Sequence, residues 1–122
     1  MTNRVIDFKT SKLLKSLGFE EPCSAYYEEG NEDHLANFNK PIFRNFHSSS
    51  TITCPTISQV LDWLWFNKDV HIEVFVNDDR TFGVIIARFD SDGKRLEDGY
   101  AGMYHSRTEA ELAAIKVALT LI

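Results

Sequence analysis

The sequence is poor in the features that several large classes of protein require. No apolar run approaches the roughly 18 residues that a membrane-spanning helix needs. The first residues lack the apolar core of a secretory signal peptide, so we expect neither export nor membrane insertion. Lys and Arg number 13 against 18 Asp and Glu, which gives a formal net charge of −5. Nucleic acids and anionic membranes select clustered Lys and Arg, so neither is an expected partner.

Cysteine is also scarce, with only Cys23 and Cys54 present. Without an export signal we expect a cytoplasmic protein in which both thiols are reduced. The candidate metal ligands are these two cysteines together with His34 and His47. Their spacings are long and lack the close pairs typical of zinc sites. We therefore expect no disulfide, no metal and no cofactor.

Motifs of catalysis are missing as well. There is no Gly-rich phosphate loop, no nucleophile elbow and no His-Glu-x-x-His. His71 and Glu73 share a face of an expected strand, and Asp62 lies among aromatic residues on an expected helix. Such groups are more often solvated surface residues than an acid and a base. We assign no catalytic residue and expect a protein that is not an enzyme, since an enzyme would need a pocket holding titratable groups.

What the chain does contain is enough apolar material for a folded domain. Hydrophobic residues make up 43% and aromatic residues 12% of 122 residues, and a chain of this length buries roughly two thirds of its unfolded surface. We expect one domain over residues 1–122. Residues 1–54 would form a helix and an irregular, partly β segment, packed on an αβββα core formed by residues 55–122.

Periodicity and turn residues place the elements of that core. Capping boxes at Thr56–Gln59 and Ser106–Glu109 begin two helices. The helices are expected near 56–67 and 107–121, and strands are expected near 71–76, 81–89 and 94–104, with a bulge indicated by glycines in the last strand. Short turns between the strands require antiparallel pairing. The predicted fold class is α+β, a two-layer sandwich with two helices on one face of a three-stranded antiparallel sheet.

The closing helix carries two apolar faces instead of one. A small face holds Ala110, Ala114, Val117, Ala118 and Leu121, and a large face holds Leu112, Ile115, Leu119 and Ile122. A surface helix needs one apolar stripe. We expect the small face to lie on the sheet and the large face to pack against another helix.

The first half gives weaker signals. A helix is expected from Phe8 to Leu17, with Asp7 as its N-cap and Gly18 just beyond its C-terminus. Residues 25–27 and 50–53 have strand composition. Residues 1–17 are basic and residues 18–35 are acidic, and exposed pairs between such segments contribute only about 0–1 kcal/mol each.

Two aromatic residues of the expected second helix are candidates for protein binding. Trp63 and Phe66 leave the arc formed by Ile57, Val60, Leu61, Leu64 and Trp65, and they lie among polar residues. They are either a binding patch or a surface that the N-terminal half covers. We expect cover, because about fifty preceding residues must pack somewhere.

The order helix, three strands, helix resembles the double-stranded-RNA-binding domain. Residues 106–114 are similar to the start of the last helix of that family, which places lysines there to meet phosphates. This chain has Glu109 and Glu111 instead, and only Arg107 is basic. Nucleic-acid binding through the basic first helix remains the alternative function, and a salt titration against duplex RNA and DNA would detect it.

A second resemblance covers nearly the whole chain. The segments Leu13–Cys23, Pro55–Leu64 and His71–Val74, and the segment from Glu109 onward, are similar in order and in pattern to small uncharacterised proteins of phages and prophages of gut bacteria. The resemblance implies a phage or prophage origin and no activity. We expect an accessory protein of the host cytoplasm that binds another protein. Neither its partner nor its oligomeric state follows from the sequence.

Overall fold

The computed structural model describes residues 6–21, 23, 25–28, 35–37 and 51–122. The chain forms two compact units, residues 1–59 and residues 60–122, which are described in turn. The expectation of a single domain over residues 1–122 stays a prediction.

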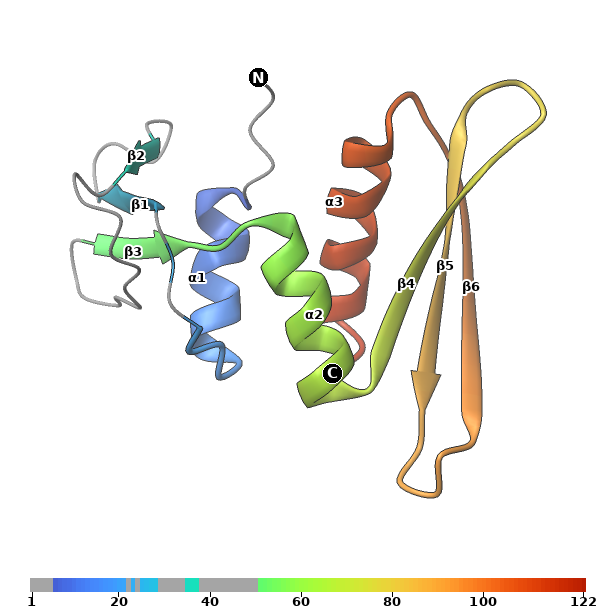
Figure 1. Cartoon of the computed structure of the whole chain (residues 1–122), viewed down its shortest axis with the longest axis horizontal. Coiled ribbons are helices and arrows are strands. Elements are labelled where there is room, and N and C mark those ends of the chain that lie inside the picture. Colours follow the sequence, from blue (N-terminus) through green and yellow to red (C-terminus); the bar gives the residue numbers. More distant parts are fainter. Residues whose placement is uncertain (1–5, 22, 24, 29–34, 38–50) are drawn as a thin grey trace. The chain divides into compact units, whose positions relative to one another are not determined.

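The first unit combines one helix with a small sheet (Figure 1). Its elements are α1 (Phe8–Ser16), β1 (Ala25–Glu28), β2 (Leu35–Asn37) and β3 (Thr51–Cys54). The strands are antiparallel in the order β2-β1-β3. The predicted helix and the strand signals at residues 25–27 and 51–53 are confirmed. The sequence left short strands or an irregular loop open between these two segments, and it did not locate strand β2, because Asn37 is more typical of turns.

The predicted ends of α1 are confirmed in detail. The carboxylate of Asp7 accepts a hydrogen bond from the backbone N–H of Thr10 at 2.8 Å. At the other end Gly18 has φ of +99°, a left-handed conformation that only glycine adopts without strain. The helix is therefore closed at both ends by residues that the sequence itself specifies.

Hydrogen bonds to Ile6 fix the start of the described chain to this sheet. The backbone N–H of Ile6 donates to the carbonyl of Pro55 at 3.1 Å. The carbonyl of Ile6 accepts from the Tyr27 hydroxyl at 3.0 Å and from the Cys54 thiol at 2.7 Å. Ile6 is itself fully buried. The residue before the α1 cap is thus held by polar groups from both β1 and the end of β3.

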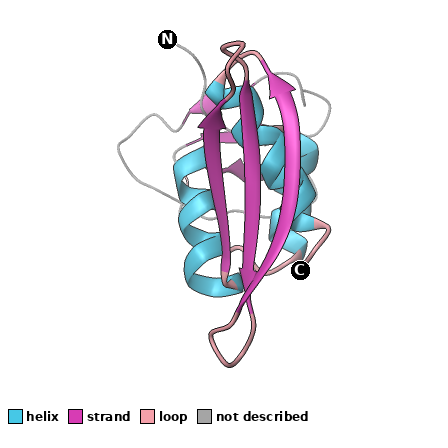
Figure 2. Ribbon diagram, turned by 90° about the vertical axis from the view of Figure 1, so that its right-hand side faces the viewer, coloured by secondary structure: helices cyan, strands magenta, loops and turns pink. Residues whose placement is uncertain are grey.

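The second unit contains the long strands. Helix α2 (Ile57–Lys68) begins in the first unit and continues into the second, where β4 (Val70–Val76), β5 (Phe82–Phe89), β6 (Arg95–Tyr104) and α3 (Arg107–Leu119) follow. The strands form an antiparallel sheet in the order β4-β5-β6, and α2 and α3 pack against it. Figure 2 shows this sheet face-on, with its strands side by side and strongly twisted. The predicted α+β fold, with these helices and strands, is confirmed.

The turns between the strands follow from their residues. In the β5–β6 turn the Asp90 carboxylate accepts from the N–H groups of Asp92 and Lys94, at 3.0 and 2.8 Å. Gly93 there has φ of +80°. The predicted bulge lies in β6, where the register shifts opposite the stretch between Phe82 and Val84.

Alanines let α3 lie close to the sheet. Backbone Cα atoms of α3 come within 8 Å of those of β4, β5 and β6. Ala110, Ala114 and Ala118 are fully buried. Side chains this small allow such a close approach, so the small face lies on the sheet as predicted. On the large face Ile115 and Leu119 are buried, whereas Ile122 is 39% exposed beyond the end of the helix.

The capping box of α2 forms completely, and in that of α3 the carboxylate of Glu109 bonds to the residue before the cap. Ser106 accepts from the N–H of Glu109 at 3.1 Å, and the Glu109 carboxylate accepts from the N–H of His105 at 3.2 Å. At the start of α2 the N–H of Gln59 donates to the Thr56 hydroxyl at 3.2 Å, and the N–H of Thr56 donates to the Gln59 side chain at 3.0 Å.

Replacing Ser106 by alanine removes the cap of α3. We expect Ser106→Ala to lower the free energy of unfolding by about 1 kcal/mol, because one orphan N–H loses its acceptor. Urea denaturation followed by circular dichroism measures the change. The matched control is Ser58→Ala on the exposed side of α2, where the change should stay within about 0.5 kcal/mol. Equal effects of the two substitutions would contradict the capping role.

Candidate functional site

The structure separates the two aromatic residues that the sequence singled out. Trp63 is buried, with 5% of its surface exposed, and the Lys68 ammonium lies 5.5 Å from the centre of its ring. Phe66 is 75% exposed. Their role in binding a protein stays a prediction, and so does the proposal that the N-terminal half covers them.

The buried arc of α2 is rotated relative to the sequence expectation. Val60 and Leu64 are fully buried as expected, and Trp63 joins them. Trp65, which was expected to face the sheet, is 44% exposed. At about 100° per residue Trp63 and Trp65 lie on opposite flanks of the Val60–Leu64 stripe, so a small rotation of the helix exchanges their environments.

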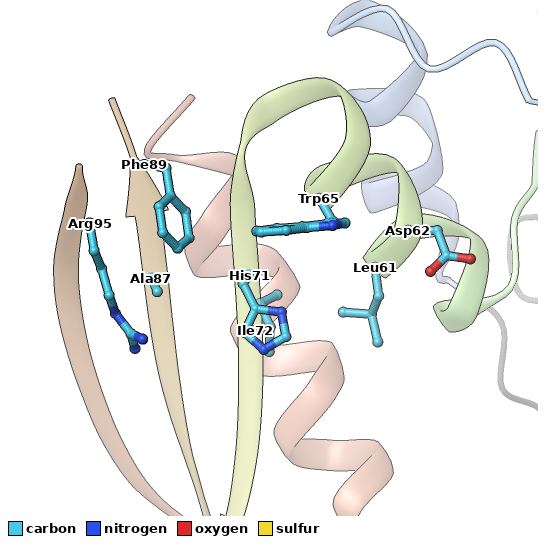
Figure 3. Close-up of a pocket in the computed structure, with 8 residues that line it drawn as sticks. All are labelled: Leu61, Asp62, Trp65, His71, Ile72, Ala87, Phe89 and Arg95. Atoms are coloured by element: carbon cyan, nitrogen blue, oxygen red, sulfur yellow. The ribbon is translucent and has the colours of Figure 1, made fainter. Parts of the chain in front are cut away.

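The half-exposed Trp65 forms one wall of a pocket. Its indole ring meets His71 edge-on, with ring centres 5.8 Å apart at 75°, and meets Phe89 in the same manner, at 5.6 Å and 79°. The pocket has a volume of about 430 Å³. Its lining residues are Leu61, Asp62, Trp65, His71, Ile72, Ala87, Phe89 and Arg95 (Figure 3).

Strand register explains why these residues meet. His71 lies opposite Ala87, and Phe89 lies opposite Arg95. Positions two apart on paired strands share one face of a sheet, so these four side chains lie on the same face. Helix α2 adds Leu61, Asp62 and Trp65 from beside β4. The pocket therefore extends from the sheet face to the groove between β4 and α2.

Charged groups lie at the two ends of the pocket. Asp62 extends from α2 at one end, and Arg95 extends from β6 at the other (Figure 3). Asp62, His71 and Arg95 are all exposed. From the sequence Asp62 and His71 are expected to be surface residues, without a connection to Trp65, Phe89 or Arg95. The alternation of the strands was a usable signal, because it places His71, Ala87 and Phe89 on one face.

Strand β4 has backbone groups that point away from β5 beside this pocket. The N–H of Phe89 donates to the carbonyl of Asp69 at 3.1 Å, and the N–H of Asn77 donates to the carbonyl of Thr81 at 2.8 Å. In an antiparallel pair such bonded positions alternate with positions whose groups point the other way. The N–H and C=O groups that point away from β5 therefore belong to Val70, Ile72, Val74 and Val76. In the described part of the chain no strand pairs with this edge.

A second pocket lies at the opposite end of the strands. It has a volume of about 480 Å³ and is lined by Asn77, Asp78, Asp79, Gly102 and Met103. The Asp79 carboxylate accepts hydrogen bonds from the backbone and side chain of Thr81, which lower the pKa of Asp79. The Asp79 carboxylate therefore stabilises the β4–β5 turn. The second pocket has fewer apolar lining residues than the first.

The two thiols are free and buried in the first unit. Cys54 lies opposite Ala25 in the β1–β3 pair. Cys23 is two residues before Ala25, so continuing the same register places Cys23 diagonally to Cys54. Diagonal Cα atoms lie about 7–8 Å apart, beyond the roughly 4.4–6.8 Å between Cα atoms that is usual for a disulfide.

The other candidate metal ligands, His34 and His47, lie outside the described residues. Within the described residues no group of three His, Cys, Asp or Glu could hold a metal ion.

Burial dominates the chemistry of these thiols. It raises the pKa of Cys54 to about 11, and it also raises the pKa of Cys23. The Lys15 ammonium lies 3.9 Å from the Cys23 sulfur, and burial lowers the pKa of Lys15. The same ammonium stands 4.7 Å from the centre of the Phe19 ring. Lys15 is thus engaged within the fold, whereas Lys9 and Lys12 are exposed, so the basic face of α1 is smaller than the sequence suggested.

The titration of Cys54 predicts a loss of stability in alkali. The folded chain keeps this proton to about pH 11, whereas an ordinary solvent-exposed thiol has a pKa of 9.0. Between these values the unfolded state binds fewer protons, so the free energy of unfolding falls as pH rises. The loss attributable to Cys54 is on the order of 2 kcal/mol. Chemical denaturation from pH 8 to pH 11 should show a shallower fall for Cys54→Ala, and identical slopes would contradict the assignment.

The different burial of the two tryptophans predicts different access to a quencher. In Trp63→Phe the remaining Trp65 should be quenched strongly by acrylamide and should emit at longer wavelength. In Trp65→Phe the remaining Trp63 should be protected. Both variants should become equally accessible in concentrated urea, which serves as the control. Equal quenching in the folded proteins would show that the α2 orientation is wrong.

In the described part of the chain, no helix combines the length and apolar character needed to cross a bilayer. No family model, curated protein or solved structure matches this chain. The case for its function therefore rests on the geometry of the pocket and the adjoining strand edge.

Proposed function

We propose that this protein binds another protein by accepting an extended segment of it along the edge of β4. The observation that carries this proposal is the row of outward-pointing backbone groups on β4 beside the aromatic pocket. Addition of a strand to a sheet edge gives affinity through main-chain hydrogen bonds, and an adjacent pocket gives specificity through one side chain. This geometry combines both parts.

The β4 edge has neither a bulge nor a proline to prevent pairing. Its register with β5 runs without interruption from Val70 to Val76, and the strand contains no proline. Natural edge strands are commonly protected by a bulge, a proline or inward-pointing charges. In this sheet the bulge is in β6, the other edge. Strand β4 is therefore the better edge for addition.

The pocket is suited to anchor one side chain of the added segment. Its volume of about 430 Å³ is within the range of roughly 300–1,000 Å³ found for binding pockets. Trp65 and Phe89 provide apolar walls, and a half-exposed tryptophan is among the residues that contribute most to binding at interfaces. An added strand would bring side chains to this wall at alternate positions.

The wider context of the proposal comes from the resemblance to phage and prophage proteins. On that basis we propose a non-enzymatic accessory protein that acts in the host cytoplasm. The sequence lacks the catalytic motifs named above, and a binding role does not require them. Nucleic-acid binding through α1 is the alternative. The engagement of Lys15 with Cys23 and Phe19 weighs against it.

A displayed library of random heptapeptides tests the proposal. Peptides selected on the full chain should shift and protect the amides of Val70, Ile72 and Val74 in NMR spectra. Val76→Pro removes one outward N–H while leaving the bonds to β5 intact, because that N–H points away from β5. We expect this substitution to weaken binding, and Val76→Ala is its matched control because Val76 is 63% exposed.

Substitutions on α2 identify the surface that is used. Trp65→Ala should weaken binding of the selected peptides, whereas Phe66→Ala should leave it unchanged, since Phe66 does not line the pocket. Circular dichroism confirms that each variant is folded. If Phe66→Ala abolished binding while Trp65→Ala and Val76→Pro did not, strand addition at β4 would be wrong. The surface around the exposed Phe66 would then be the binding surface.

A further inference from the structure

The aromatic walls leave the Trp65 ring available to a ligand. His71 and Phe89 both contact Trp65 at steep angles, 75° and 79°, with ring centres more than 5 Å away. A T-shaped contact covers less of a ring face than parallel stacking does, and 44% of the surface of Trp65 is exposed. An exposed indole face is the strongest aromatic partner for a cation.

Negative charge lies near this face. Asp62 is three residues before Trp65 on α2, and residues at that spacing are neighbours on a helix surface. It lines the pocket and is exposed. Glu73 is also exposed, two residues beyond His71 on β4 and on the same face of the sheet. Arg95 is a positively charged residue that lines the pocket, and it lies at the end of the pocket away from Asp62 (Figure 3).

We propose that the pocket beside β4 accepts an arginine side chain of the added segment, with its guanidinium stacked on Trp65 and paired with Asp62. This inference rests on the proposed function and names the chemistry of the anchoring residue. A planar guanidinium stacks on an aromatic face and pairs with a carboxylate at the same time. The formal net charge of −5 also speeds the encounter with a basic segment.

Other anchoring side chains fit less well. A phenylalanine could stack on Trp65, but it would cover Asp62 without giving its carboxylate a partner, which costs free energy. A lysine ammonium is compact and strongly hydrated, so it gains less from an aromatic face. A glutamate would meet Asp62 and Glu73 with like charge. The combination of indole and carboxylate therefore favours arginine.

Matched heptapeptides test the inference. One alanine-rich backbone carries arginine, lysine, citrulline or phenylalanine at its central position, and binding to the full chain is measured by calorimetry. Citrulline keeps the shape of arginine without its charge. We expect the arginine peptide to bind about tenfold more tightly than the citrulline peptide, the ratio that a cation–π contact and a carboxylate pair together supply. The advantage should shrink as salt is raised.

Asp62→Asn is the decisive variant. It should remove most of the preference for arginine over citrulline while leaving the citrulline peptide unaffected. Asp69→Asn is the matched control, because Asp69 is an exposed carboxylate that does not line the pocket. Tighter binding of the phenylalanine peptide, or an unchanged arginine preference in Asp62→Asn, would overturn the arginine assignment.

The failure of this inference can be told apart from the failure of the proposed function. If all four peptides protect the amides of Val70, Ile72 and Val74 equally, strand addition stands and the arginine assignment is wrong. If none protects those amides, strand addition itself is wrong. The single residue N-acetyl-arginine amide then tests the pocket alone. If this compound shifts the NMR signal of the Trp65 indole, and the shift is lost in Asp62→Asn, the pocket is still an arginine site. If it causes no shift, the arginine assignment is wrong as well.

Discussion

The close packing of α3 on the three-stranded sheet is the contact on which the second unit depends. A sheet with one apolar face must bury that face against another element. Ala110, Ala114 and Ala118 present almost no side chain, so the helix backbone approaches the strands closely. Ile115 and Leu119 then face away from the small stripe and are buried in their turn. A helix with one small and one large apolar face is thus buried on both faces.

That arrangement also explains where the candidate site lies. Because the helical layer covers one face, the side chains of His71, Ala87 and Phe89 remain on the other. Helix α2 runs directly into β4 with a single intervening residue, Asp69, in a left-handed conformation with φ of 55°. This short connection brings the last turns of α2 beside the edge of β4. The indole of Trp65 consequently reaches His71 and Phe89, and a groove forms next to the edge of β4, with which no strand of the described residues pairs.

In the first unit polar contacts fix the start of the described chain. Its small sheet has short strands, and the carbonyl of Ile6 receives both the hydroxyl of Tyr27 and the thiol of Cys54. Desolvation holds the pKa of both donors high, so both remain protonated donors at neutral pH. Two side chains that look unremarkable in sequence therefore fix the residue that precedes the α1 cap.

Local signals in the sequence determined most of the elements. Capping residues such as Asp7, Thr56 and Ser106 mark helix starts by a hydrogen bond within four residues, and strand alternation with short turns requires an antiparallel sheet. Interactions between residues a few positions apart depend only on the local sequence, so they can be recognised without coordinates. Only the tertiary structure decided the rotation of α2, which buries Trp63 and exposes Trp65. It alone brought Asp62, Trp65, Phe89 and Arg95 around one pocket, because these residues meet through packing between elements distant in sequence.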